Sequence, residues 1–86
     1  NSYSVFNEAG TDYDFRVESV NFTHAFFVQG SDGNIGLNVS SPSAQFHVNS
    51  TSTGEPAAYF YSNASKTVPC VQIYQDGAGA SGAAYK

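Results

Sequence analysis

The chain has 86 residues, and a domain of that size buries only about 60 to 65 % of its unfolded surface, so its stability needs a supplement. The single cysteine, Cys70, excludes a disulfide within the chain, which leaves self-association as the expected supplement. Seven Phe and six Tyr favour strands over helices, while a net charge of −4 with three basic residues excludes a phosphate-binding patch. From this charge we expect no nucleic acid as a partner. No apolar run is long enough to span a membrane, so we also expect no membrane insertion.

Short apolar runs recur along the first half of the chain, with polar residues at every second position. In chain order the runs are Tyr3 and Val5; Phe15 and Val17; Phe26 and Val28; Ile35, Leu37 and Val39; and Phe46 and Val48. Glycine, Asn, Asp and Pro separate them at residues 7–10, 30–34 and 40–43. This pattern predicts an all-β fold, with short antiparallel strands in a small sandwich or an intertwined β-rod.

The pattern changes in the second half of the chain. Pro56, Pro69 and Gly82 stand thirteen residues apart. They are followed in register by Ala58, Val71 and Ala84, and then by Tyr59, Gln72 and Tyr85. We therefore divide the chain into a β-rich segment over residues 1–50 and the start of a 13-residue β-repeat shaft over residues 51–86. We expect the chain to be a piece of a longer protein, with the shaft continuing beyond Lys86.

Five sequence blocks in order resemble a segment of the tail-fibre and appendage proteins of tailed bacteriophages. They are VFNEAG at 5–10, DFRVES at 14–19, THAFFV at 23–28, GNIG at 33–36 and SPSAQFHV at 41–48. The resemblance implies an elongated homotrimer in the virion, upstream of a receptor-binding or chaperone module and in contact with other virion proteins. One departure is the sequence at 37–39, Leu-Asn-Val, where such segments more usually have a Gly-Thr-Thr type of turn.

Taken together, these features predict a structural fibre component that acts as a trimeric shaft or connector and presents a host-recognition module. The proposed core of the trimer consists of Phe15, Val17, Phe26, Val28, Phe46, Val48, Val71 and Ile73. Cys70 precedes Val71, and we expect it to be a small buried hydrophobic residue.

An alternative function is a carbohydrate-binding adhesin domain that contacts a host surface glycan directly. Tyr59, Tyr61 and Tyr74 would then form a sugar-stacking surface. Packing within a trimer explains the same residues, because tyrosine places an apolar ring in an interface and its hydroxyl at the rim. The direction in which these rings point distinguishes the two functions.

We expect no enzyme activity, no cofactor and no metal. The serines lack a nucleophile-elbow motif, and the two histidines, His24 and His47, show no metal-ligand spacing. A strand surface on which Arg16 pairs with Asp14 or Glu18 accounts for the clustered carboxylates. In a trimer, the threefold axis would bring three copies of one histidine together. The sequence therefore leaves open whether such a histidine binds an ion on that axis.

Overall fold

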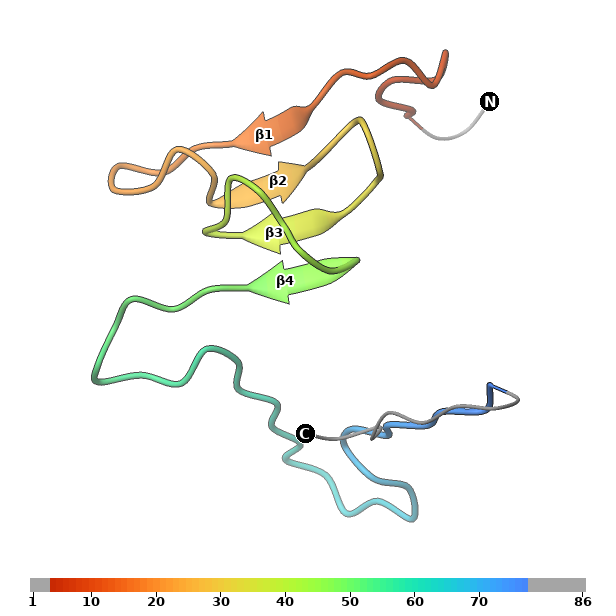
Figure 1. Cartoon of the computed structure of the whole chain (residues 1–86). Helices are drawn as coiled ribbons and strands as arrows, with labels where there is room; N and C mark the ends of the chain where they lie inside the picture. Colours follow the sequence, from red (N-terminus) through yellow and green to blue (C-terminus); the bar gives the residue numbers. More distant parts are fainter. Residues whose placement is uncertain (1–3, 78–86) are drawn as a thin grey trace.

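The structure is a computed structural model that describes residues 4–77, and it contains one small sheet (Figure 1). The four strands, which lie in the sheet in chain order, are β1 (Phe15–Val17), β2 (Phe26–Val28), β3 (Ile35–Leu37) and β4 (Phe46–Val48). Residues 4–77 contain no helix, which confirms the predicted all-β class. Within that range no segment qualifies as a membrane-crossing helix.

The sheet is mixed. β1 pairs with β2, and β2 with β3, in antiparallel fashion, whereas β3 and β4 are parallel. The expectation of antiparallel strands therefore holds for the first two pairings only. Parallel neighbours need a crossover, usually of a dozen or more residues and often helical. Here residues 38–45 make the crossover without a helix and pass over one face of the sheet (Figure 1).

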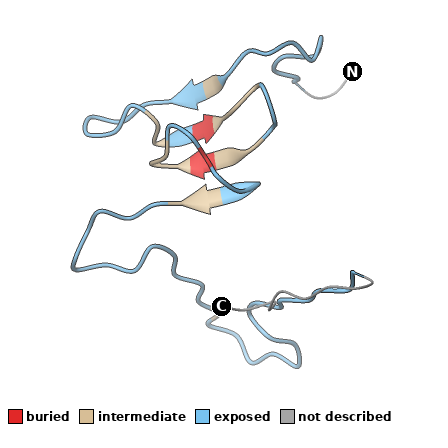
Figure 2. Cartoon of the chain, in the orientation of Figure 1, coloured by how far each residue is buried: buried red, intermediate tan, exposed pale blue. Residues whose placement is uncertain are grey.

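The interior of the sheet lies beneath this crossover. Phe27 is the one large hydrophobic residue buried among residues 4–77, with 3 % of its surface exposed. The His24 ring packs against it nearly at a right angle, with 4.8 Å between ring centroids. Figure 2 shows that burial is confined to the middle of β2 and β3 within the sheet. The chain thus closes one face of its sheet by itself.

Gly36 lets the crossover approach the sheet. A Cβ atom at this position would lie 3.0 Å from the Val39 carbonyl oxygen and 3.1 Å from Cγ of Pro42. Both atoms belong to the crossover, so a side chain on residue 36 would push it away from Phe27.

We expect Gly36→Ala to lower the free energy of unfolding by about 1 kcal/mol, because the added methyl group overpacks the crossover. Urea denaturation followed by circular dichroism measures this change. Gly54→Ala is the matched control, since a Cβ there meets nothing within 4 Å. Equal stability of the two variants would show that the crossover yields without strain.

The turns lie where the sequence predicts them. Asn7 and Gly10 both have positive φ, at 62° and 69°, and the Asn7 side chain is hydrogen-bonded to the backbone of Thr11. The β2–β3 hairpin closes through a hydrogen bond of 2.9 Å from Gln29 N to the Asn34 carbonyl. Gly33, with φ 77°, supplies the left-handed conformation in that hairpin.

The rest of the described chain is irregular and lies outside the sheet (Figure 1). Residues 50–77 contain no strand, and no hydrogen bond joins two backbone groups among them. The 13-residue β-repeat therefore stays a prediction, and its third start, Gly82, lies outside the described residues. The first predicted apolar run consists of Tyr3 and Val5. Val5 is not in a strand, and Tyr3 lies outside the described residues.

Candidate functional site

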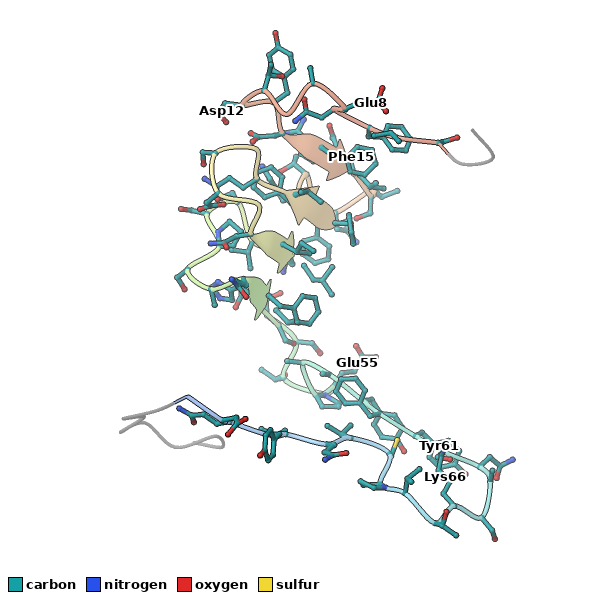
Figure 3. All side chains as sticks on the ribbon, turned by 90° about the vertical axis from the view of Figure 1, so that its right-hand side faces the viewer. Glu8, Asp12, Phe15, Glu55, Tyr61 and Lys66 are labelled. Carbon is teal, nitrogen blue, oxygen red and sulfur yellow. The ribbon has the colours of Figure 1, made fainter. Side chains whose placement is uncertain are left out.

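The candidate functional site is the face of the sheet opposite the crossover. Residues paired across neighbouring strands point to the same side of a sheet, and side chains alternate along each strand. The observed register therefore places eight apolar side chains on this face in two rows: Phe15, Val28, Ile35 and Phe46 in the first row, and Val17, Phe26, Leu37 and Val48 in the second. We call these eight residues the apolar face. In Figure 3 Phe15 projects from the side of the sheet away from the crossover.

The apolar face is not covered by the described part of the chain. Phe46 has 62 % of its surface exposed, and Val17 and Phe26 are also exposed. The other members are only partly buried. A contiguous apolar surface of this kind on a small domain marks an interaction site.

The structure brings together six of the eight residues that the sequence assigns to the trimer core. Those six are Phe15, Val17, Phe26, Val28, Phe46 and Val48. Val71 and Ile73 are exposed residues outside the sheet, so their place in a shared core stays a prediction.

The predicted core omitted Ile35 and Leu37, although their period-two spacing gave the signal. Val39 continues the same spacing, but it leaves the apolar face because Asn38 turns the chain with φ 60°. Val39 packs instead against Gly36, on the crossover side. Alternation alone could not show where the strand ends.

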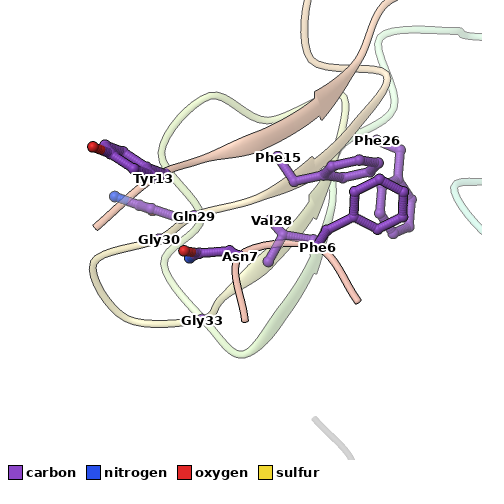
Figure 4. Close-up of a pocket in the computed structure, with 9 residues that line it drawn as sticks. All are labelled: Phe6, Asn7, Tyr13, Phe15, Phe26, Val28, Gln29, Gly30 and Gly33. Carbon is purple, nitrogen blue, oxygen red and sulfur yellow. The ribbon is translucent and has the colours of Figure 1, made fainter. Parts of the chain in front are cut away.

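A hollow of about 430 Å³ opens at the β1 end of the apolar face. Figure 4 shows the rings of Phe6, Phe15 and Phe26 gathered at one end, with polar side chains at the other. The Phe6 ring lies 5.0 Å from that of Phe15, and the Phe15 ring meets Phe26 edge-on at 6.4 Å. Phe6 had no periodic signal in the sequence and joins the site only through the fold.

The polar end of the hollow contains a buried acceptor without a partner. Oε1 of Gln29 is inaccessible to solvent and makes no hydrogen bond within the described chain. Asn7 and Tyr13 line the same end. Beside them, Gly30 N donates a hydrogen bond of 2.8 Å to Oδ1 of Asp14, which fixes the segment before β1 against the hairpin.

Charged side chains lie on the other side of the sheet or at its margins. Arg16 contacts Glu18, with 2.8 Å from Nη2 to Oε2, and both side chains are about half exposed. The sequence allowed either Asp14 or Glu18 as the ion-pair partner of Arg16, and the structure pairs it with Glu18. The Asp14 carboxylate instead accepts a hydrogen bond from the Gly30 backbone. An exposed pair of this kind adds little to stability.

The two histidines do not meet. His24 Nδ1 lies 3.0 Å from the Thr23 hydroxyl, and His47 Nδ1 accepts a hydrogen bond of 3.1 Å from Ser43 N. Among residues 4–77, no group of three His, Cys, Asp or Glu side chains is arranged to hold a metal ion. His47 shares its side of the sheet with Gly36, opposite to the apolar face.

The three tyrosines of the alternative sugar-stacking surface, Tyr59, Tyr61 and Tyr74, are all exposed. The rings of Tyr59 and Tyr61 stack with centroids 6.2 Å apart and planes 19° from parallel. The expectation that Cys70 is buried is wrong for the single chain, since its thiol is exposed. The segment makes no strand pairing that would cover it.

No protein-family model, curated protein or solved structure matches this chain.

Proposed function

We propose that this chain is a non-catalytic structural segment of a bacteriophage fibre, a homotrimeric connector in the virion that presents a host-recognition module. The apolar face is the observation that carries the proposal. Eight apolar side chains in register on one side of a four-stranded sheet need a second layer, and the described chain supplies none. Other copies of the chain supply it in the proposed trimer.

The exposed area of the chain supports this proposal. A folded monomer of 9.1 kDa is expected to expose about 4,900 Å², whereas this chain exposes 7424 Å². The excess of about 2,500 Å² is larger than the roughly 800 Å² that one partner buries in a standard interface. A partner layer on the apolar face would remove part of this exposed area.

The distribution of charge also favours identical copies as partners. The apolar face contains no charged residue, and the pair Arg16–Glu18 is at the other side or the margin of the sheet. Copies of a chain with net charge −4 can therefore meet through this face without opposing their carboxylates. The resemblance to phage fibre segments supplies the setting, a trimer in an external fibre.

Light scattering of the chain at several concentrations tests the proposal. We expect a mass three times that of the 9.1-kDa chain, and we expect Val17→Asp to convert it to a monomer because the carboxylate would be desolvated in the apolar interface. Val20→Asp is the matched control, an equally large change at a fully exposed valine outside the sheet. A wild-type chain that stays folded and monomeric at every concentration would overturn the proposal.

A carbohydrate-binding adhesin is the second candidate function, favoured by one observation. The stacked, exposed rings of Tyr59 and Tyr61 present a flat aromatic surface, and the Tyr61 hydroxyl lies 3.5 Å from the Asn63 side-chain oxygen. Aromatic surfaces flanked by amides suit sugar rings. A monomeric chain in the scattering experiment would make this function the leading one.

A further inference from the structure

The two ends of the apolar face are complementary to each other. At one end Phe46 projects from β4, the edge strand, and 62 % of its surface is exposed. At the other end, beside the opposite edge strand β1, the apolar face is hollowed. Phe46 and the hollow belong to the same row of side chains, since Phe15, Val28, Ile35 and Phe46 are successive neighbours across the sheet.

The hollow has the size and lining that a phenyl ring requires. Its volume is about 430 Å³, and Phe6, Phe15 and Val28 form its apolar wall. An apolar cavity of roughly 150 Å³ already accepts benzene, so one ring fits with space for its flanking backbone. Asn7, Tyr13 and Gln29 line the polar end of the hollow, beside the space that the backbone flanking the ring would occupy.

The outer edge of β4 is also free to pair. Its parallel ladder with β3 uses the Gln45 carbonyl and the Asn49 N–H, so the backbone groups of Phe46 and Val48 point away from β3. No charged residue or proline protects this edge. β1 is the strand at the other edge of the sheet, with β2 as its single neighbour.

We propose that copies of this chain join head to tail, with Phe46 at the β4 edge of one copy seated in the hollow beside β1 of the next. The inference rests on the self-association in the proposed function and specifies its geometry. A projection and a socket at opposite edges of one sheet make a heterologous contact, which closes into a ring when repeated by rotation. The ring leaves neither edge unpaired and turns every apolar face toward a shared centre.

A pair of variants separates the projection from the socket. Phe46→Ala removes the projection, and Phe6→Asp places a carboxylate in the wall of the socket. Both residues are exposed and neither is needed to close the crossover side of the sheet, so both variants keep the fold. We expect each variant alone to raise the dissociation constant at least about tenfold, as measured by light scattering.

Phe22→Ala is the matched control for Phe46→Ala, because Phe22 is 40 % exposed and lies in the β1–β2 connection, outside both the apolar face and the predicted shaft. It should keep the mass of the wild-type chain.

Mixing the two variants gives the decisive result. Phe46→Ala keeps an intact socket and Phe6→Asp keeps an intact projection, so an equal mixture has one good contact per pair. We expect the mixture to form dimers and nothing larger, and this recovery also shows that both variants are folded. Mixed variants that stay monomeric, or Phe46→Ala that assembles like the wild type, would overturn the inference.

Cysteine cross-linking tests the head-to-tail order directly, in a Cys70→Ser background. A chain with Phe46→Cys should form a disulfide with a chain carrying Phe6→Cys, and neither should cross-link to itself. Cross-linking of Phe46→Cys to itself would instead indicate a face-to-face arrangement about a twofold axis. If the wild-type chain is a trimer but the mixing or cross-linking result is contrary, only the head-to-tail geometry is contradicted. If the wild-type chain is a monomer, the proposed function itself is contradicted.

Discussion

Replacing Phe27 with alanine is expected to unfold the sheet. Phe27 is the one large hydrophobic residue buried within residues 4–77, between the His24 ring and the crossover. Truncating a buried Phe costs about 3 to 5 kcal/mol, and small domains have total stabilities near the lower end of 5 to 15 kcal/mol. Thermal unfolding followed by circular dichroism, at a fixed chain concentration, measures the effect. Phe27→Ala should either be unfolded already at 25 °C or unfold with a sharply lower midpoint.

Phe22→Ala is the control for this experiment. Phe22 is 40 % exposed and lies in the β1–β2 connection, outside the sheet, so the same truncation should cost clearly less. If Phe27→Ala and Phe22→Ala lowered the midpoint equally, burial beneath the crossover would not be what stabilises the sheet.

The second large effect is expected for Gly30→Ala. A Cβ atom on residue 30 would overlap the carbonyl oxygen of Tyr13 and would lie 2.6 Å from its carbonyl carbon and nitrogen. These are backbone atoms, so the methyl group cannot be accommodated by rotating a side chain. The segment before β1 must move, with strain or loss of the hydrogen bond from Gly30 N to Asp14. We expect a loss of about 1 to 3 kcal/mol in the free energy of unfolding, measured by urea denaturation.

The same substitution should also weaken assembly, because Tyr13 and Gly30 both line the hollow at the β1 end of the apolar face. Gly54→Ala again serves as the control, with nothing within 4 Å of the added methyl group. Chemical shifts of Tyr13 and Asp14 should change in Gly30→Ala and not in Gly54→Ala. Unchanged stability and unchanged shifts would contradict the close approach of the two segments.

The two sides of the sheet account for why this chain is expected to assemble. The crossover covers the side that bears Phe27 and Gly36, so that side is complete within one chain. The other side has the larger set of apolar groups and is left open. A small domain that leaves such an apolar side open to water loses the burial that would stabilise it. Identical copies can cover that side without bringing charged residues together.

The irregular segment after the sheet also leaves apolar side chains that a single chain does not cover. Residues 50–77 are rich in exposed apolar side chains and make no backbone pairing with one another. Pairing across copies would provide hydrogen-bond partners for this backbone and cover Val71 and Ile73. The predicted β-repeat shaft is of this kind, because each repeat has too few residues to bury a face by itself.

The sequence by itself determined the local features of the fold. Alternation placed the strands at Phe15–Val17, Phe26–Val28 and Phe46–Val48, and turn residues located the bends at Gly10 and Gly33. Both signals are local: side chains alternate within any strand, and glycine at a bend needs only its own backbone conformation. The same alternation identified six residues of the apolar face.

The tertiary structure decided which side of the sheet is closed. Phe26 and Phe27 are adjacent and chemically identical, and only the crossover determines that Phe27 is buried within the chain. The crossover in turn depends on Gly36 meeting Val39 and Pro42, and it makes the β3–β4 pairing parallel. The hollow likewise needs Phe6 to fold back onto Phe15. These are contacts between separate segments, which local periodicity does not encode.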